Sequence, residues 1–103
     1  MPKLEPLVAT SVTYFSQHDE TAFFDWLNRL ECVAGFEGSG KHLFIDLERI
    51  PTDDDLRDLL ALFHRYKVNM RQLARFDRPR RAWFHNPKAY WYRRVFGSAP
   101  PVG

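Results

Sequence analysis

The chain has 103 residues, of which 45% are hydrophobic, 16% aromatic and 27% charged, and its formal net charge is +2. This length suits one domain with its own core, and this hydrophobic content excludes a disordered chain. The uninterrupted apolar runs are far shorter than the ~20 residues of a spanning helix, so we expect no transmembrane segment and no membrane partner.

The two ends and the single cysteine bear on domain organisation and location. Both ends hold proline, glycine or small residues, so we expect one domain over 1–103, with an ordered core at about 8–96 and flexible ends at 1–7 and 97–103. Cys32 is the only cysteine, which excludes an internal disulfide, and we interpret it as a small core residue. Because the N-terminus has no secretory-signal pattern, the sequence favours a cytoplasmic protein.

The first predicted elements are a strand and a helix. Residues 8–16 are rich in β-branched and aromatic side chains, which favour a strand. Asp19 is the predicted N-cap of a helix that runs to about Glu31. The apolar residues of this helix recur with the spacing of one helical face: Phe23, Trp26, Leu27 and Leu30.

A short glycine-containing connection follows. It separates two strand-like segments, 33–37 and 41–47, and is typical of a β-hairpin turn. The second segment is nearly all apolar, so we expect it to be the central strand of a sheet, covered on both faces. Residues 35–41 also have the spacing of a P-loop up to Lys41. A P-loop needs Ser or Thr after the lysine and then a helix, whereas His42 and a strand follow here, so we expect no nucleotide cofactor.

The second half of the chain favours helices. Thr52 is the predicted N-cap of a helix whose first turn holds three aspartates, where the helix dipole favours carboxylates. The apolar face of this helix continues to Tyr66 with the helical period. Residues 68–73 fit either a strand or a short helix capped by Asn69, and we favour the helix.

A final helix and the order of the elements complete the predicted fold. Asn86 favours a cap and Pro87 the first helical turn, so we expect a helix over 87–96 that stops at Gly97. The order β-α-β-β-α predicts an α+β fold, in which helices cover a small, mostly antiparallel sheet and the C-terminal segment is helical. If 68–73 is a strand instead, the order becomes β-α-β-β-α-β and a ferredoxin-like sheet is the alternative.

Catalytic and metal-binding patterns do not emerge from the sequence. The four histidines, at 18, 42, 64 and 85, have no spacing that would place two of them on one helical face. Ser39 lies between two glycines without completing a GxSxG pattern, and Cys32 has no CxxC partner. We therefore expect no metal, no cofactor and no enzymatic activity, although an active site assembled only in three dimensions would escape this reasoning.

Charge is distributed unevenly along the chain. Residues 1–63 carry five Lys or Arg against twelve Asp or Glu, whereas residues 64–103 carry ten Lys or Arg against Asp77 alone. Two interpretations stay open. The basic half forms a binding surface, or its arginines neutralise the acidic half within the same fold.

Aromatic residues are interleaved with the basic ones. Tyr90, Trp91 and Tyr92 are consecutive, and since no helix can bury three successive residues on one face, we expect at least one of them to be exposed. Arginine and aromatic side chains are enriched at protein-binding hot spots and at surfaces that stack nucleic-acid bases. The candidate binding residues are an aromatic and basic set, Arg78, Arg80, Arg81, Trp83, Tyr90, Trp91 and Tyr92, and an acidic set, Asp53, Asp54, Asp55 and Asp58.

Two functions fit these residues. The first is a non-enzymatic protein–protein interaction module of the small inhibitor or immunity type, whose partner is another protein. The alternative is a nucleic-acid-binding protein that stacks bases on Trp83 or Trp91 and neutralises phosphates with arginines 71, 75, 78, 80 and 81. The acidic first half would repel phosphates, so the protein partner is favoured.

Overall fold

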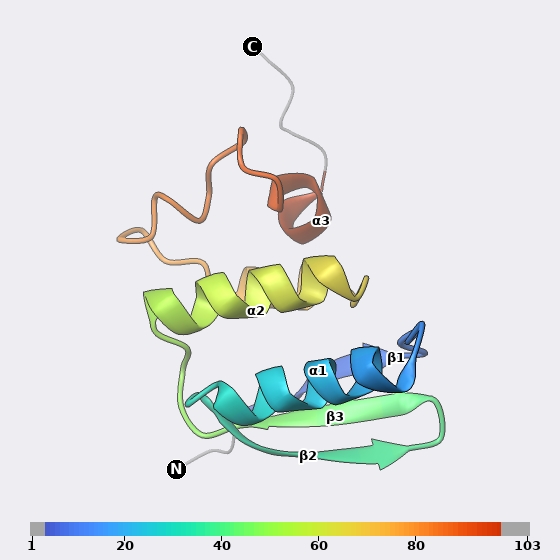
Figure 1. The fold of residues 1–103 in the computed structure, drawn as a ribbon. Helices are drawn as coiled ribbons and strands as arrows, with labels where there is room; N and C mark the ends of the chain where they lie inside the picture. Colours follow the sequence, from blue (N-terminus) through green and yellow to red (C-terminus); the bar gives the residue numbers. More distant parts are fainter. Residues whose placement is uncertain (1–3, 98–103) are drawn as a thin grey trace.

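The structure is a computed structural model that describes residues 4–97 (Figure 1). Residues 1–3 and 98–103, which hold much of the ends predicted to be flexible, lie outside the described residues. The elements in chain order are β1 (Leu7–Thr10), α1 (Gln17–Arg29), β2 (Val33–Ser39), β3 (His42–Leu47), α2 (Asp53–Arg65), the 3-10 helix η1 (Arg71–Phe76) and α3 (Tyr92–Phe96). The predicted α+β class is confirmed. No helix within 4–97 is long and apolar enough to cross a membrane.

The sheet has three antiparallel strands in the order β1-β3-β2. β3 is therefore the central strand, as predicted, but only one of its faces is covered. Ile45 is fully buried, whereas its neighbour Phe44 is 36% exposed, because successive side chains of a strand point to opposite faces. Both long helices lie on the Ile45 side of the sheet (Figure 1). The prediction that β3 is covered on both faces was wrong, because an apolar run alone does not reveal that both helices pack on the same side of the sheet.

The hairpin between β2 and β3 closes through two residues. Ser39 pairs with His42, which leaves Gly40 and Lys41 as the turn. Gly40 has φ +60°, a left-handed conformation that glycine adopts without steric cost. The hairpin prediction is confirmed, and the P-loop spacing has no helix after it to bind a phosphate.

β1 is shorter than the predicted strand and begins one residue earlier. It ends at Thr10 because Ser11 has φ 50°, which interrupts the extended chain. Leu7 is fully buried in this strand, and Gly97 at the other end of the described residues is buried as well. The outer edge of β1 pairs with a side chain: Gln72 accepts from Val8 N at 2.8 Å and donates to Val8 O at 2.9 Å.

The cap of α1 corrects a second prediction. Ser16, not Asp19, is the N-cap, and its Oγ accepts a hydrogen bond from Asp19 N at 3.1 Å. The Asp19 carboxylate in turn accepts from Phe15 N at 3.0 Å. Asp19 therefore occupies the N3 position of a reciprocal arrangement that resembles a capping box.

α2 begins as predicted, with Thr52 as its cap and Asp55 completing a capping box. Burial disfavours the Asp55 carboxylate, but hydrogen bonds from Thr52 and Arg49 outweigh it, so the pKa of this group lies below its ordinary value. The helix lies between α1 and the C-terminal segment, which we define as residues 77–97 (Figure 1). It is correspondingly apolar, with five fully buried residues: Leu56, Leu59, Leu60, Leu62 and Phe63.

The chain beyond α2 contains less regular helix than predicted. Residues 71–76 form a 3-10 helix, so within 4–97 the sheet has three strands and lacks the fourth that a ferredoxin-like fold requires. The predicted helix over 87–96 is reduced to α3. Asn86 bonds through its side chain to Lys88 N at 3.0 Å, which forms a turn instead of a helix start. Phe84 and Val95 nevertheless join the same buried core as the sheet and the long helices.

Candidate interaction surface

The structure separates the candidate binding residues into buried and accessible ones. Asp55, Arg81 and Tyr92 are only 8%, 3% and 3% exposed, so they belong to the interior of the fold. Trp83 and Trp91 are half-buried, and Tyr90 is 53% exposed. The prediction that at least one of the three consecutive aromatic residues is exposed is therefore confirmed by Tyr90.

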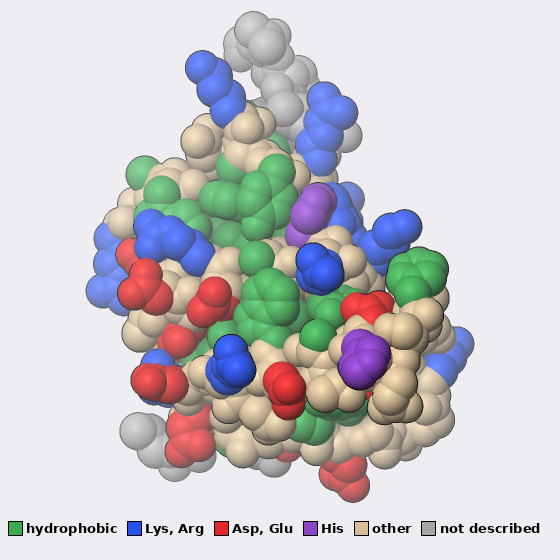
Figure 2. All heavy atoms as spheres, viewed as in Figure 1, with side chains coloured by type: hydrophobic (Ala, Val, Ile, Leu, Met, Phe, Trp, Pro, Cys, Tyr) green, Lys and Arg blue, Asp and Glu red, His purple; other side chains and the backbone are tan. Residues whose placement is uncertain are grey.

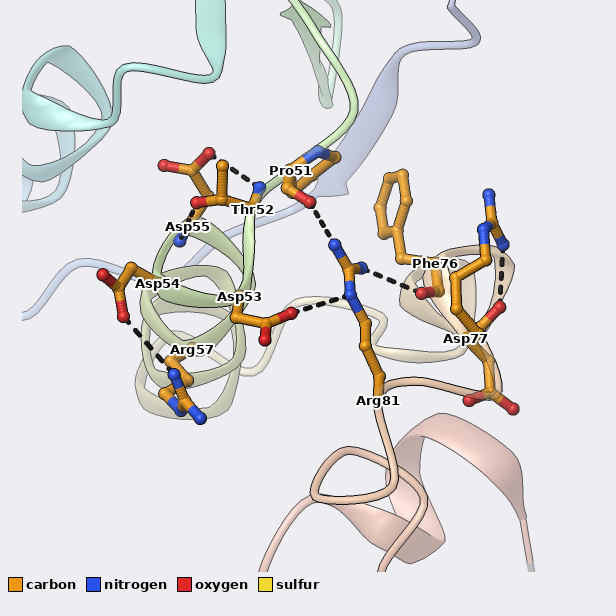
Figure 3. A network of polar contacts seen from close by, with 10 residues as sticks. Pro51, Thr52, Asp53, Asp54, Asp55, Arg57, Phe76, Asp77 and Arg81 are labelled. Carbon is orange, nitrogen blue, oxygen red and sulfur yellow. Dashed lines mark hydrogen bonds and ion pairs between the residues drawn. The ribbon is translucent and has the colours of Figure 1, made fainter.

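Arg81 joins three segments of the chain (Figure 3). Its Nη1 donates to Phe76 O at 2.9 Å, and its Nη2 donates to Pro51 O. Its Nε lies 2.9 Å from Asp53 Oδ1, which is an ion pair without the alignment of a hydrogen bond. Arg81 thus holds the start of α2 and the end of η1 against the C-terminal segment.

The acidic set does not form a separate acidic face. Asp54 pairs with Arg57 at 3.3 Å, and Asp53 pairs with Arg81. A hollow of about 600 Å³ is lined by Thr52, Asp53 and Asp54 together with Arg57, Arg80 and Arg81. Acidic and basic residues that are far apart in the sequence therefore meet at the start of α2. The arginines neutralise part of the acidic half, as one of the two open interpretations held.

Four of the arginines considered for phosphate binding differ in how far other groups of the protein already occupy their guanidinium groups. Arg75 lies 3.3 Å from the Glu5 carboxylate and also donates to Glu5 O and Pro6 O. Arg78 donates to two nearby backbone carbonyl groups. Arg71 and Arg80 are exposed.

An aromatic and cationic cluster lies where α2 meets the C-terminal segment. The Arg57 guanidinium lies 4.2 Å from the centre of the Trp83 ring, and the Trp83 and Trp91 rings are 5.9 Å apart. The ring centres of Trp91 and Tyr90 are 5.0 Å apart, and those of Tyr90 and His64 are 4.8 Å apart. Arg94 ends the series, 3.2 Å from the His64 ring. We call this set the aromatic–arginine surface: Arg57, His64, Trp83, Tyr90, Trp91 and Arg94.

The ring contacts in this surface are predominantly edge-to-face. The interplanar angles are 80° for Trp83 with Trp91 and 83° for Tyr90 with Trp91. In such pairs the positive edge of one ring contacts the negative face of the next, which fixes the rings against one another. Partial burial raises the pKa of the Tyr90 phenol above its ordinary value, so this hydroxyl keeps its proton and can donate at neutral pH.

The hydrogen bond from Arg94 selects one tautomer of the neutral His64 ring. Arg94 Nη1 lies 3.2 Å from His64 Nδ1, and a guanidinium can only donate. Nδ1 is therefore the acceptor, which places the ring proton of the neutral histidine on Nε2. The Arg94 end of the surface thus offers only donors to an incoming ligand: the remaining guanidinium N–H groups and the imidazole Nε2–H.

Three residues of the surface were not among the candidates from sequence. Arg57 and His64 are seven residues apart in α2, a spacing that places both on one face of the helix, and this signal was available. Arg94 gave no comparable signal, because its contact with His64 depends on how α3 packs beside α2. Trp83, Tyr90 and Trp91, by contrast, were predicted.

A second feature is a hollow between α1 and α2. It measures about 470 Å³ and is lined by Ala22, Asp25, Trp26, Arg29, Leu30 and Asp58. Figure 2 shows hydrophobic side chains both between the helices and over the C-terminal segment, with charged side chains around them. The hollow contains acidic and basic groups together, so no single ligand charge is favoured.

Cys32 is the single cysteine of the chain, and its thiol is buried. Burial raises the pKa of Cys32 to about 11, with the Asp55 carboxylate as a second cause. The described residues contain no group of three or more His, Cys, Asp or Glu that could hold a metal ion. No family model, curated protein or solved structure matches the chain.

Proposed function

We propose that this protein is a non-enzymatic binding domain of the small inhibitor or immunity type, acting in the cytoplasm, which docks another protein on its aromatic–arginine surface. The observation that carries the proposal is the cluster of two tryptophans, one half-exposed tyrosine and two arginines at one place on the surface. Trp, Tyr and Arg are the residue types that most often dominate protein-binding energy.

The rigidity of the cluster supports protein docking. The Trp91 indole donates to Phe84 O at 2.7 Å, and the rings hold one another edge-to-face. Side chains that are already fixed lose little conformational entropy when a partner covers them. A partner would therefore meet a preformed surface.

Nucleic-acid binding is the weaker alternative for the same residues. Base stacking needs an accessible aromatic face, but Arg57 covers one face of Trp83 and Trp91 packs against its neighbours. Arg81 is buried, Arg75 is paired with Glu5, and Asp54 adjoins Arg57. These contacts reduce the positive charge available to a phosphate backbone.

The test is affinity capture from the native cell with matched variants. Tyr90→Ala removes an exposed anchor, and Phe44→Ala removes an exposed aromatic side chain from the uncovered face of the sheet. We expect the wild type and Phe44→Ala to retain a protein that Tyr90→Ala loses. With the purified partner, Tyr90→Ala should weaken binding about tenfold or more, the scale of a hot spot.

Nuclease treatment separates the two alternatives. Retention of the partner after nuclease digestion supports a protein surface, whereas release would favour nucleic acid. If Tyr90→Ala retains the same protein with unchanged affinity, the aromatic–arginine surface is not the docking site. Circular dichroism of both variants controls for folding.

A further inference from the structure

The aromatic–arginine surface is electrostatically one-sided. Arg57 at one end is paired with the Asp54 carboxylate. The hydrogen bonds of the Arg94 guanidinium within the described residues go to His64, to Nδ1 at 3.2 Å and to the carbonyl oxygen at 3.5 Å, and no carboxylate of these residues pairs with it. One end of the surface is thus neutralised within the protein, and the other end keeps its positive charge.

The surroundings of Arg94 contain little acidic charge. Between residues 59 and 97 the sequence has a single acidic residue, Asp77, and its carboxylate lies 2.9 Å from His85. In Figure 2 the part of the visible face around α3 shows Lys, Arg and His side chains and no Asp or Glu. The local field therefore attracts an anionic partner group.

We propose that the partner docks an acidic segment on this surface, with an Asp or Glu carboxylate at the Arg94 end and an apolar side chain against Tyr90 and Trp91. This inference rests on the proposed function and names the chemistry of the partner. A carboxylate accepts charge-assisted hydrogen bonds from a guanidinium, and the His64 ring, whose Nε2–H is a further donor, lies 4.8 Å from the Tyr90 ring. The half-exposed Tyr90 ring and the partly buried Trp91 ring provide the apolar contact that fixes the segment beside that carboxylate.

Blocked peptides provide the test. One hexapeptide alternates glutamate with leucine and phenylalanine, and its counterpart has glutamine in place of each glutamate. Binding is followed by NMR titration of the amide and indole N–H signals, with oligo(dT) as the nucleic-acid probe. Because a charge-assisted hydrogen bond contributes about 1.5 to 3 kcal/mol, we expect the glutamate peptide to bind about tenfold more tightly or better.

Arg94→Gln and Arg29→Gln are the matched variants, since Arg29 is exposed on α1 and lines a different hollow. Arg94→Gln should remove the preference for glutamate, while Arg29→Gln should keep it. Equal binding of the two peptides, tighter binding of oligo(dT), or no saturable binding of the glutamate peptide would overturn the inference. If both peptides bind equally and Tyr90→Ala abolishes both, the charge inference fails while the docking surface stands.

Discussion

Trp83 and Trp91 are neighbours on the surface but differ in how their indole N–H groups are satisfied. Trp91 Nε1 donates to Phe84 O at 2.7 Å. Trp83 Nε1 is buried and has no acceptor in the described part of the chain. A buried donor without a partner destabilises the folded state, because it has lost its hydrogen bonds to water. Two residues that look equivalent in the sequence therefore contribute differently to stability.

The two tryptophans give a matched pair of substitutions. Trp91→Phe loses a hydrogen bond and leaves the Phe84 carbonyl without this donor, so it should cost about 1 kcal/mol or more beyond the loss of ring area. Trp83→Phe loses similar area and also removes an unsatisfied donor, so its net cost should be smaller. Urea unfolding of both variants checks this order. A larger cost for Trp83→Phe would mean that its N–H has a partner in solution.

At the scale of single elements, the N-caps of α1 and α2 have the same pattern, but only the cap of α2 was predicted correctly. Thr52 was predicted as an N-cap from the aspartates that follow it, although its reciprocal contact with Asp55 was not predicted. Ser16 and Asp19 have the same spacing, but the extended strand predicted over 8–16 concealed the cap. The strand is interrupted by the left-handed conformation of Ser11. A serine in the sequence does not predict this conformation.

The predicted helix over 87–96 was too long, because side-chain hydrogen bonds replace the helical pattern before Tyr92. Asn86 and Pro87 are favourable at a helix start, but the Trp91 indole bonds back to Phe84 O. This contact, together with the Asn86 turn, holds residues before α3 as successive turns. Local propensity therefore located the end of the helix at Gly97 but not its beginning.

Substitutions of the adjacent residues Arg80 and Arg81 test whether Arg81 holds α2 and η1 against the C-terminal segment. Arg81→Lys replaces a planar fork by a single ammonium group, which cannot reach Pro51 O, Phe76 O and Asp53 together. We expect a loss of about 1 to 3 kcal/mol in the free energy of unfolding. Arg80→Lys, at an exposed position, should change it by less than about 0.5 kcal/mol. Equal effects on thermal unfolding would refute the role assigned to Arg81.

At the scale of the whole molecule, charge that is separated along the sequence is interleaved in space. Glu5 meets Arg75 and Asp53 meets Arg81 across long stretches of chain. Sequence reasoning could name Tyr90 and Trp91 because three consecutive aromatic residues cannot all be buried on one helical face, and Trp83 because it lies among basic residues. It could not separate buried Arg81 from exposed Arg80, because that difference arises only when η1 and α2 pack together.

The shared core predicts that the chain unfolds as one unit. Phe84 and Val95 belong to the same buried cluster as Phe23 in α1 and Ile45 in β3, so the C-terminal segment should not unfold before the sheet. In the double variant Trp83→Phe with Trp91→Phe, the remaining tryptophan is Trp26, so its fluorescence follows the unfolding of α1. In Trp26→Phe the remaining tryptophans are Trp83 and Trp91, so their fluorescence follows the unfolding of the C-terminal segment. In each variant the urea midpoint from tryptophan fluorescence should coincide with that from far-ultraviolet circular dichroism. An earlier fluorescence midpoint in Trp26→Phe alone would show instead that residues 77–97 detach from α2 while the sheet and the long helices stay folded.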